Sequence, residues 1–593
     1  MPAFSKVLVA NRGEIAVRIF RTLRELGIAT VAVYSEADRG SLHIAAADEA
    51  YLIGPGPASE SYLKQERLLD AAARAGAEAV HPGYGFLAEN AGFARACETA
   101  GLIWIGPPPE AIELMGSKTA AREAMRAAGV PIVPGTTDPV DSAEAVLRLG
   151  EEIGWPIAIK AAAGGGGKGL RVASGPDEAE RAYDSARREG EAYFADATVY
   201  VERYLEDPRH VEVQVLADAH GTVIHLGERD CTIQRRHQKL VEETPSPAVD
   251  DELRERIGRL GVDAARAVGY RSAGTIEGLL DRDGNYFFLE MNTRIQVEHT
   301  VTELVTGLDL VREQVLIAAG EPLSLSQHDV RLTGHAIECR INAEDPSNGF
   351  LPSPGRISTY REPAGPGVRV DSGVAAGSEV VGLYDPLVAK LVVHGVDRDH
   401  ARRRMLRALG EYEIGGVTTL LGFHRALLEH PCFAVGETCH GVVESKELAD
   451  RAEELSHQKT TVSAAPDGRL RERVERVELD GRLYEVTALV PEPPFAELAR
   501  KRRERTGHGA HQGAAKDAVV TPMQGTVLTV EVANGEAIRS GQVICIVEAM
   551  KMENEITSHR DGIVTALSVA PGEPVTSGQV VCVIAQEADG DSP

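Results

Sequence analysis

The chain has 593 residues, of which 43% are hydrophobic and 26% are charged, proportions typical of globular proteins. One hydrophobic core rarely serves so long a chain, so we expect several domains. The formal net charge of −26 disfavours nucleic-acid binding, and no apolar run approaches the length of a membrane span.

The cysteines and the N-terminus bear on the cellular compartment. None of the seven cysteines forms a C-x-x-C pair, so their spacing predicts neither a zinc site nor a disulfide framework. The first residues lack the apolar core of a signal peptide. We therefore expect a cytoplasmic protein in a reducing environment.

The N-terminal residues predict a βαβ unit. Residues 7–10 and 30–34 have the apolar character of buried strands, and residues 14–26 have the periodicity of an amphipathic helix. The turn between them, residues 11–14, does not match G-x-G-x-x-G, so no dinucleotide site is predicted. Residues 81–90 combine turn-forming and aromatic residues and predict a tight loop.

A glycine-rich loop between two short strands indicates phosphate binding in residues 115–332. Residues 157–160 and 170–172 are predicted as strands, and residues 161–169 contain five glycines. Glycine lets backbone N–H groups approach phosphate oxygens and lets a loop close as a lid. The loop is not a P-loop, because Lys168 is followed by glycine rather than Ser or Thr. A flexible linker has a similar composition, but the flanking strands favour a nucleotide site.

Two carboxylates then flank a predicted hairpin. Glu277 precedes the turn at residues 281–285, and Glu290 follows it, so their strands should be antiparallel neighbours. Carboxylates on one face of adjacent strands repel unless a cation separates them. With a carbonyl oxygen from Asn292, they suit Mg²⁺ bridging ATP phosphates. The alternative is two solvated carboxylates at a sheet edge.

Residues 292–299 contain a cation, an amide and a carboxylate at alternate positions. In an extended segment Arg294, Gln296 and Glu298 share one face, where they can bind bicarbonate and remove its proton. A plain salt bridge between Arg294 and Glu298 is the structural alternative. The basic run at residues 234–239 could likewise be a solvated face.

An internal repeat ends the chain. Residues 525–548 and 562–585 align at an offset of 37 and are identical at eleven of 24 positions. Each copy alternates β-branched and polar residues between glycine-containing turns, which predicts a small flattened β-barrel with pseudo-twofold symmetry. Lys551 falls in the connection between the copies, where it could carry a covalent group or be an ordinary surface lysine.

These stretches carry a family resemblance. Residues 11–14, 81–90 and 105–107 resemble the N-terminal domain of biotin carboxylase, the glycine-rich lobe resembles the biotin carboxylase branch of the ATP-grasp fold, and residues 343–355 and 384–390 resemble its C-terminal domain. Residues 549–552, Ala-Met-Lys-Met, resemble the biotinylation motif; lipoyl domains share the fold but usually lack these methionines. The chain thus resembles the α-subunit of a bacterial acyl-CoA carboxylase. Ala163 and Gly278 depart from the usual pattern.

The resemblance implies a multidomain fold of five segments. They are an α/β N-terminal domain (1–114), an α+β ATP-grasp domain with a glycine-rich lid (115–332), an α+β C-terminal domain (333–445), a subunit-contact region with a flexible linker (446–518), and an all-β flattened-barrel biotinyl domain (519–586). Within the fourth segment, residues 474–479 and 483–487 read as two strands around Asp480-Gly481.

The resemblance also implies residue roles. Biotin would be attached to Lys551. Mg²⁺ or Mn²⁺ would be bound by Glu277, Glu290 and Asn292. Bicarbonate would be bound by Lys239, Arg294, Gln296, the Val297 backbone and Arg340. Glu298 would be the catalytic base, and Arg340 would stabilise the biotin enolate. ATP would be contacted by Lys118, Lys160, Gly166, Gly167, Glu202, Arg203, Tyr204, Leu205, His210, Gln234, His237 and Lys239.

The predicted activity is therefore ATP-dependent carboxylation of biotin by bicarbonate. The resemblance implies a separate carboxyltransferase β-subunit that uses acetyl-CoA or propionyl-CoA, a biotin protein ligase, and a homo-oligomer within an α–β complex. Pyruvate carboxylase is a close relative, so pyruvate stays open as the final acceptor. Two further hypotheses stay open: an ATP-grasp ligase with a lipoyl-like carrier, and a carrier or scaffold without activity.

Overall fold

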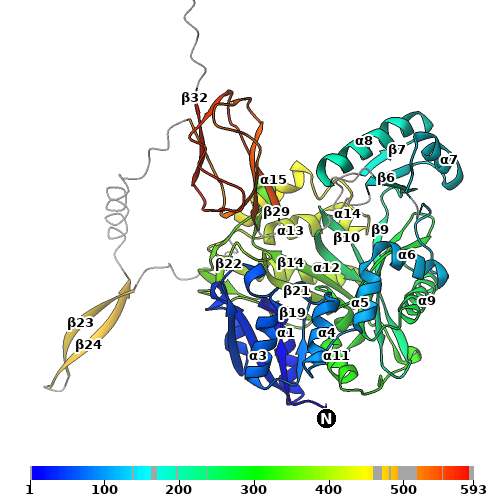
Figure 1. The fold of residues 1–593 in the computed structure, drawn as a ribbon. Helices are drawn as coiled ribbons and strands as arrows, with labels where there is room; N and C mark the ends of the chain where they lie inside the picture. The colour runs from blue at the N-terminus through cyan, green and yellow to red at the C-terminus, as the bar shows by residue number, and fades with distance from the viewer. Residues whose placement is uncertain are drawn as a thin grey trace, which may run out of the picture. The chain divides into compact units, whose positions relative to one another are not determined.

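A computed structural model describes residues 3–136, 139–161, 170–194, 198–236, 238–457, 470–479, 482–491, 517–549 and 552–585 (Figure 1). The chain divides into two compact units, residues 1–457 and 458–593. None of the helices in the described ranges combines the length and apolar character that a membrane span requires.

The N-terminal part of the first unit is a five-stranded parallel sheet in the order β3-β2-β1-β4-β5. The predicted βαβ unit is confirmed, as is the loop that follows β4. The elements are β1 (Lys6–Val9), α1 (Gly13–Glu25), β2 (Ala29–Ser35), α2 (Leu42–Ala46), β3 (Glu49–Gly54), α3 (Gln65–Ala75), β4 (Ala79–His81), α4 (Ala91–Thr99), β5 (Ile103–Trp104) and α5 (Pro109–Gly116).

A small lobe follows, built on the antiparallel sheet β7-β6-β8. The strands predicted on either side of the glycine-rich loop are confirmed, because Lys160 on β6 pairs with Leu170 on β7. The loop itself, residues 162–169, lies outside the described residues. The elements are α6 (Lys118–Ala127), α7 (Ala143–Ile153), β6 (Ile157–Ala161), β7 (Leu170–Ala173), α8 (Pro176–Phe194) and β8 (Val199–Arg203).

The largest sheet of the first unit has eight antiparallel strands in the order β13-β12-β9-β10-β11-β14-β21-β19. It extends across the predicted domain boundary at residues 332–333. Its elements and adjoining helices are β9 (Arg209–Ala217), β10 (Val223–Arg235), β11 (Gln238–Thr244), α9 (Asp251–Ala267), β12 (Ser272–Leu280), β13 (Tyr286–Asn292), α10 (His299–Thr306), α11 (Leu310–Ala318), β14 (His335–Asn342), β19 (Val368–Ser372) and β21 (Leu387–Gly395).

The helices that end the first unit include α15 (Lys446–His457), which lies beyond the predicted boundary at residue 445 and yet belongs to this unit. The others are α12 (Arg398–Glu411), α13 (Leu421–Glu429) and α14 (Pro431–Ala434), and the short strands pair as β15 (Glu344–Asp345) with β16 (Leu351–Pro352), β17 (Gly355–Arg356) with β20 (Glu379–Val380), and β18 (Thr359–Arg361) with β22 (Glu413–Gly415).

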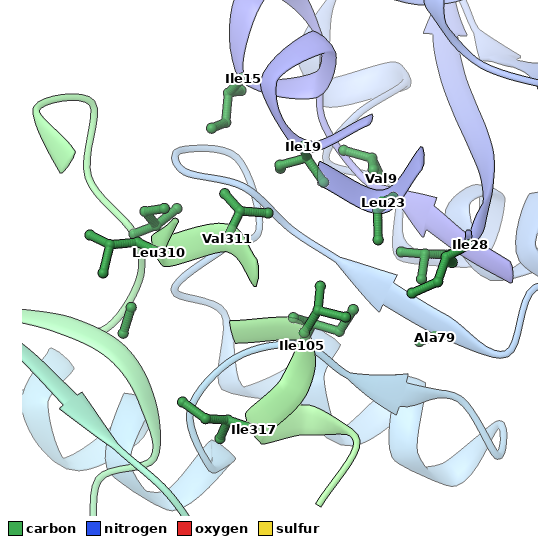
Figure 2. Close-up of a cluster of buried hydrophobic side chains, with 14 of the residues drawn as sticks. Val9, Ile15, Ile19, Leu23, Ile28, Ala79, Ile105, Leu310, Val311 and Ile317 are labelled. Carbon is green, nitrogen blue, oxygen red and sulfur yellow. The ribbon is translucent and has the colours of Figure 1, made fainter. Parts of the chain in front are cut away.

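A hydrophobic core joins the N-terminal sheet and α1 to helix α11. Side chains of α1, among them Ile15, Ile19 and Leu23, contribute to the same buried cluster as Leu310 and Val311 of α11 (Figure 2). Residues nearly 300 positions apart therefore share one core. This continuity makes residues 1–457 a single compact unit despite their several sheets.

One expectation about the cysteines is wrong. Cys432 and Cys439 form a disulfide bond, with their Cα atoms 5.5 Å apart. The chain turns back after α14 and brings the two residues together, a proximity that a search for C-x-x-C spacing does not detect. The other five cysteines are free and buried.

The second unit contains a hairpin and two four-stranded sheets. The predicted strand pair is confirmed and is longer than expected: β23 (Leu470–Leu479) pairs with β24 (Arg482–Pro491). The sheets are β25-β32-β30-β27 and β29-β28-β26-β31, formed by β25 (Ala518–Val520), β26 (Gly525–Val530), β27 (Ala537–Ile538), β28 (Val543–Ala549), β29 (Met552–Thr557), β30 (Gly562–Thr565), β31 (Pro574–Val575) and β32 (Val580–Ala585).

The two sheets confirm the flattened barrel and its pseudo-twofold symmetry. Exchanging each strand of one repeat for its counterpart in the other converts one sheet order into the other. Gly525 and Gly562 are equivalent even in detail, because a Cβ atom at either position would lie 2.4 Å from a strand carbonyl oxygen, that of Glu548 or Ala585. The repeated glycines are thus required by close backbone approach.

Candidate active site

A row of charged side chains crosses one face of the eight-stranded sheet. Arg229, Glu212, Glu277 and Glu290 lie directly opposite one another, in this order, on β10, β9, β12 and β13. Like charges directly opposite on neighbouring strands destabilise a sheet. The three carboxylates therefore require positive charge beyond that of Arg229.

Lys239 of β11 supplies part of this charge. Its Nζ atom donates to Glu212 at 2.6 Å, to Glu277 at 2.9 Å and to Glu298 at 2.6 Å. Burial would lower the pKa of Lys239, but the surrounding carboxylates, Glu212 and Glu298 foremost, raise it well above its usual value. Lys239 is therefore a fixed positive charge at the centre of the cluster.

Glu298 is held by two cations at the beginning of α10. Besides Lys239, Arg340 donates to it through Nη2 at 3.0 Å, and the Nε atom of Arg340 donates to Glu242 at 2.6 Å. Burial tends to raise the pKa of Glu298, but Lys239 and Arg340 outweigh it and lower that pKa well below its usual value. The carboxylate is consequently ionised and able to accept a proton.

The segment before α10 differs from the predicted extended strand. β13 ends at Asn292, and residues 293–298 form an irregular loop. Gln296 nevertheless reaches the cluster, where its Nε2 atom donates to Glu277 at 2.6 Å. Arg294 donates instead to Glu89, at 2.9 Å, and to Asn292, at 2.7 Å. Arg294 and Glu298 therefore do not form the alternative salt bridge. Arg294 pairs with Glu89, and Glu298 pairs with Lys239 and Arg340.

The charges of the predicted metal ligands Glu277 and Glu290 suit a divalent cation, and the ligand atoms that lie within 4.8 Å of one another here are those of His210, Glu212 and Glu277. The hairpin prediction is confirmed, since Glu277 and Glu290 are cross-strand partners. Among the described residues no hydrogen bond or ion pair holds the side chain of Glu290, and burial followed by the charge of Glu277 raises its pKa. A cation between two facing carboxylates would remove this repulsion. Asn292 donates to Glu277 at 2.7 Å, and its carbonyl oxygen, which accepts from Arg294, keeps a second lone pair for a cation.

The predicted nucleotide residues lie in the small lobe and at its border. Lys160 of β6 forms an ion pair with Glu202 of β8, so the predicted phosphate and adenine contacts are neighbours. Lys118 begins α6, immediately after the helix-capping Ser117. At the end of β8 the backbone N–H groups of Arg203 and Tyr204 donate to the carbonyl oxygens of Pro134 and Pro156. Tyr204 is exposed and Leu205 is buried.

Of the other predicted residues, two lie in the described part of the chain and four lie outside it. His210 lies in the charged cluster, with Nε2 2.8 Å from a Glu277 oxygen, and Gln234 on β10 donates to the Cys231 carbonyl oxygen at 2.7 Å. Residues outside the described ranges are Gly166, Gly167, His237 and Lys551. The strands flanking Lys551 end in a cross-strand pair, Ala549 with Met552.

Several residues of the cluster were not predicted: Glu89, Glu212, Arg229, Glu242 and Lys390. Lys390 is fully buried, and its Nζ atom donates to the Val297 carbonyl oxygen at 3.0 Å and lies 3.2 Å from Glu14. Residues 211–215 alternate valine with Glu or Gln, which is a sequence signal for Glu212, and Glu89 and Lys390 lie in stretches that carry the family resemblance. The others come from distant segments and converge only in the folded chain.

Family models match four stretches of the chain. Residues 3–112 match "Biotin carboxylase, N-terminal domain", residues 117–326 match "Carbamoyl-phosphate synthase L chain, ATP binding domain", residues 338–445 match "Biotin carboxylase C-terminal domain", and residues 517–584 match "Biotin-requiring enzyme". These four matches include both the charged cluster and the flattened barrel.

Individual relatives agree with the family models. The chain is 47% identical over 572 residues to a biotin-dependent acyl-coenzyme A carboxylase alpha3 subunit of Mycobacterium leprae, covering 94% of both chains. It is 54% identical over 434 residues to a pyruvate carboxylase subunit of Methanothermobacter thermautotrophicus, covering 73% of this chain and 88% of the relative. A solved biotin carboxylase domain of Hydrogenobacter thermophilus 2-oxoglutarate carboxylase, in complex with MgADP, ADP and bicarbonate, has a TM-score of 0.69 and 50% identity, and the match covers 74% of this chain and 99% of that one.

The fold, the charged cluster and these matches together define a component of a biotin-dependent carboxylase. The chain belongs to the biotin carboxylase family, in the form that combines the carboxylase domains and a biotinyl domain in one polypeptide. Its reaction is the ATP-dependent carboxylation of biotin. The predicted fold class and the cofactors biotin and ATP are thereby confirmed.

Proposed function

We propose that the chain is the α-subunit of an acyl-CoA carboxylase, which carboxylates biotin on Lys551 and delivers the carboxyl group to a separate carboxyltransferase β-subunit that uses acetyl-CoA or propionyl-CoA. One observation carries this proposal. The acyl-CoA carboxylase relative aligns over almost the whole length of both chains, whereas the pyruvate carboxylase relative aligns over about three quarters of this chain. The biotin carboxylase part is common to both and does not discriminate between acceptors.

In the proposed reaction, Glu277, Glu290 and Asn292 would hold Mg²⁺ or Mn²⁺, and this cation would neutralise charge on the ATP phosphates. Lys118 and Lys160 would contact those phosphates, and Glu202 and the backbone at Leu205 would bind adenine. The ion pair between Lys160 and Glu202 supports this arrangement, because the two groups are neighbours on the adjacent strands β6 and β8. Gly166 and Gly167 would close over the nucleotide.

Bicarbonate would bind among Lys239, Arg294, Gln296 and the Val297 backbone. Glu298 then takes the bicarbonate proton, so that a bicarbonate oxygen can attack the γ-phosphorus while ADP leaves. Negative charge develops on biotin when it forms the enolate. Arg340, which donates to Glu242 and Glu298, would stabilise that charge. These ion pairs fix the relative positions of the proposed base and its neighbouring cation.

The proposal is tested by reconstituting the biotinylated chain with a carboxyltransferase β-subunit from the same organism. We expect bicarbonate-dependent carboxylation of acetyl-CoA or propionyl-CoA, and no product from pyruvate. A Lys551→Arg chain is the matched control, because arginine keeps the positive charge but has no amine to which biotin can be attached by an amide bond. Carboxylation of pyruvate alone would reassign the chain to a pyruvate carboxylase.

ADP release by the α-subunit with free biotin tests the nucleotide assignment separately. We expect release that requires bicarbonate and that Lys118→Ala abolishes. Undiminished release in Lys118→Ala would refute the role assigned to this lysine, whatever the acyl acceptor is.

A further inference from the structure

Arg229 is a fully buried residue whose guanidinium group uses every nitrogen. Its Nε atom donates to Glu212 at 2.6 Å. The other two nitrogens each donate twice, to Gln214 at 2.7 Å and Thr302 at 3.0 Å from Nη1, and to Thr275 at 3.1 Å and Gln296 at 2.6 Å from Nη2. An arginine has five N–H donors, so all of them have acceptors here.

The contact with Gln296 fixes the orientation of its amide group. A guanidinium can only donate, so the Gln296 Oε1 atom must face Arg229. The Nε2 atom at the other end donates at 2.6 Å to Glu277, a carboxylate that is ion-paired with Lys239 and therefore only accepts. A flipped amide would bring its N–H groups against Arg229 and its oxygen against the Glu277 carboxylate, so both contacts become repulsive.

This orientation matters to the proposed bicarbonate pocket. One N–H of the Gln296 amide is used by Glu277, and the other is left to donate. Bicarbonate presents negatively charged oxygen acceptors, which an N–H attracts and a carbonyl oxygen repels. The direction of the amide therefore decides whether Gln296 favours or opposes binding of this anion.

The remaining hydrogen-bond partners of Arg229 fix the orientation of its guanidinium plane. Gln214, Thr275 and Thr302 are neutral acceptors on β9, β12 and α10, so three separate elements define where the guanidinium points. A salt bridge to Glu212 alone would not need them, and a buried ion pair by itself adds little net stability. Their arrangement around one arginine indicates a positioning role.

We propose that Arg229 is a positioning residue for bicarbonate binding, which acts by holding the Gln296 amide with its N–H groups toward the pocket. The inference rests on the proposed role of Gln296 in the carboxylation of biotin. Arg229 itself touches no substrate and acts through Gln296. It also neutralises Glu212, the first of the three carboxylates in the row.

The test compares Arg229→Lys with the unaltered full-length chain, using ADP release with free biotin as the assay. Lysine keeps the charge near Glu212 but cannot maintain five directed hydrogen bonds. We expect KM for bicarbonate to rise at least about tenfold, as loss of a charged hydrogen bond predicts, and KM for MgATP to change by less than about twofold. Arg254→Lys is the matched control, because Arg254 pairs with the buried Glu228 elsewhere on the sheet.

A double-mutant cycle shows whether Arg229 acts through Gln296. We expect Gln296→Ala to raise KM for bicarbonate in the unaltered chain and to add little in the Arg229→Lys background. Additive effects would overturn the inference, as would equal changes in both KM values for Arg229→Lys. If Arg229→Lys unfolds, Thr275→Val replaces it, because it removes only the second acceptor of Nη2 and should raise KM for bicarbonate about threefold or more.

Failure of the inference and failure of the proposed function give different results. Absence of bicarbonate-dependent ADP release in the unaltered chain would reject the proposed function. Normal release in that chain, with Arg229→Lys and Arg254→Lys behaving alike, would reject only the role of Arg229.

Discussion

Glu298 is a buried carboxylate that is paired with two partly buried cations, Lys239 and Arg340. Because Lys239 and Arg340 lower its pKa well below the usual value, it is ionised at neutral pH but is a weak base in this arrangement. A substrate anion that draws either cation away would raise this pKa and strengthen the base. The contacts with Lys239 and Arg340 that keep Glu298 ionised thus make its basicity depend on bicarbonate binding.

Glu298→Gln tests this assignment at the residue scale. We expect bicarbonate-dependent ADP release to fall by about 100-fold or more, because glutamine has nearly the same shape but cannot take a proton. ATP binding, measured by calorimetry, should change little, since no nucleotide contact is assigned to Glu298. Retention of a tenth or more of the activity would assign the base elsewhere.

His43 predicts a pH dependence of stability. Burial, opposed in part by Asp38, lowers the pKa of His43 to about 4, and its Nε2 atom contacts the Val33 carbonyl oxygen at 3.2 Å. The unfolded chain therefore takes up a proton from about pH 6.5 downward while the folded chain does not. The contribution of His43 to stability is consequently present above that pH and is lost as the pH falls from about 6.5 toward 4.

We expect His43→Gln to remove this contribution to the slope, because glutamine can keep a hydrogen bond to Val33 without titrating. Between pH 7 and pH 4 the free energy of unfolding of the variant should fall by up to about 3 kcal/mol less than that of the unaltered chain. Denaturant unfolding at several pH values measures the difference. Parallel pH profiles would show that His43 is not buried as a neutral group.

At the residue scale, the fold brings together predicted site residues that are close along the chain. The sequence predicts a metal site at Glu277 and Glu290 and a bicarbonate site at Gln296 and Glu298. Contacts to Glu277 and Lys239 bring these two neighbouring stretches together in the fold. Glu89 and Lys390 could not be found in this way, because their partners are about 200 and 90 residues away. A local pattern carries no information about such contacts.

At the scale of elements, the repeat was the most informative feature. Two similar halves must bury equivalent faces, so the β-barrel and its symmetry followed from the sequence alone. The loop at residues 293–298 was harder, since alternating polar residues also occur in irregular segments that hydrogen bonds hold in place. Packing around Gly278 was left open by the sequence and is explained by Tyr286, whose ring occupies the space of a side chain there.

Gly278→Ala tests this packing. A Cβ atom at residue 278 would lie 2.2 Å from the Tyr286 ring, and Tyr286 is itself buried and donates to the Ile276 carbonyl oxygen at 3.2 Å. We expect a loss of about 1–3 kcal/mol in the free energy of unfolding from overpacking. Gly284→Ala in the neighbouring turn is the contrast. Gly284 has a positive φ but open space around it, so this substitution tests backbone strain without overpacking. Tyr286→Leu should relieve much of the Gly278→Ala loss, and an unrelieved loss would indicate another cause.

At the scale of the whole molecule, the domains of the first unit are less separate than the sequence suggests. The eight-stranded sheet crosses residues 332–333, and the core in Figure 2 joins α1 to α11. Family resemblance divides the chain where related sequences begin and end, whereas the folded chain divides where contacts become few. For this reason α15 belongs with the biotin carboxylase domains.

Truncation distinguishes the two divisions. A chain ending at residue 457 should keep ADP release with free biotin, since it retains the charged cluster and its complete sheet, but it cannot carry covalent biotin. A chain ending at residue 445 also keeps the cluster but loses α15, which buries Leu448, Ala452 and Leu455 and packs so closely on α13 that a Cβ atom at Gly422 would lie 2.4 Å from the Ala452 carbonyl oxygen. Exposing the partners of the two leucines should cost roughly 3–6 kcal/mol. We therefore expect the shorter chain to unfold at clearly lower denaturant concentration, and equal midpoints would show that α15 contributes nothing to the unit.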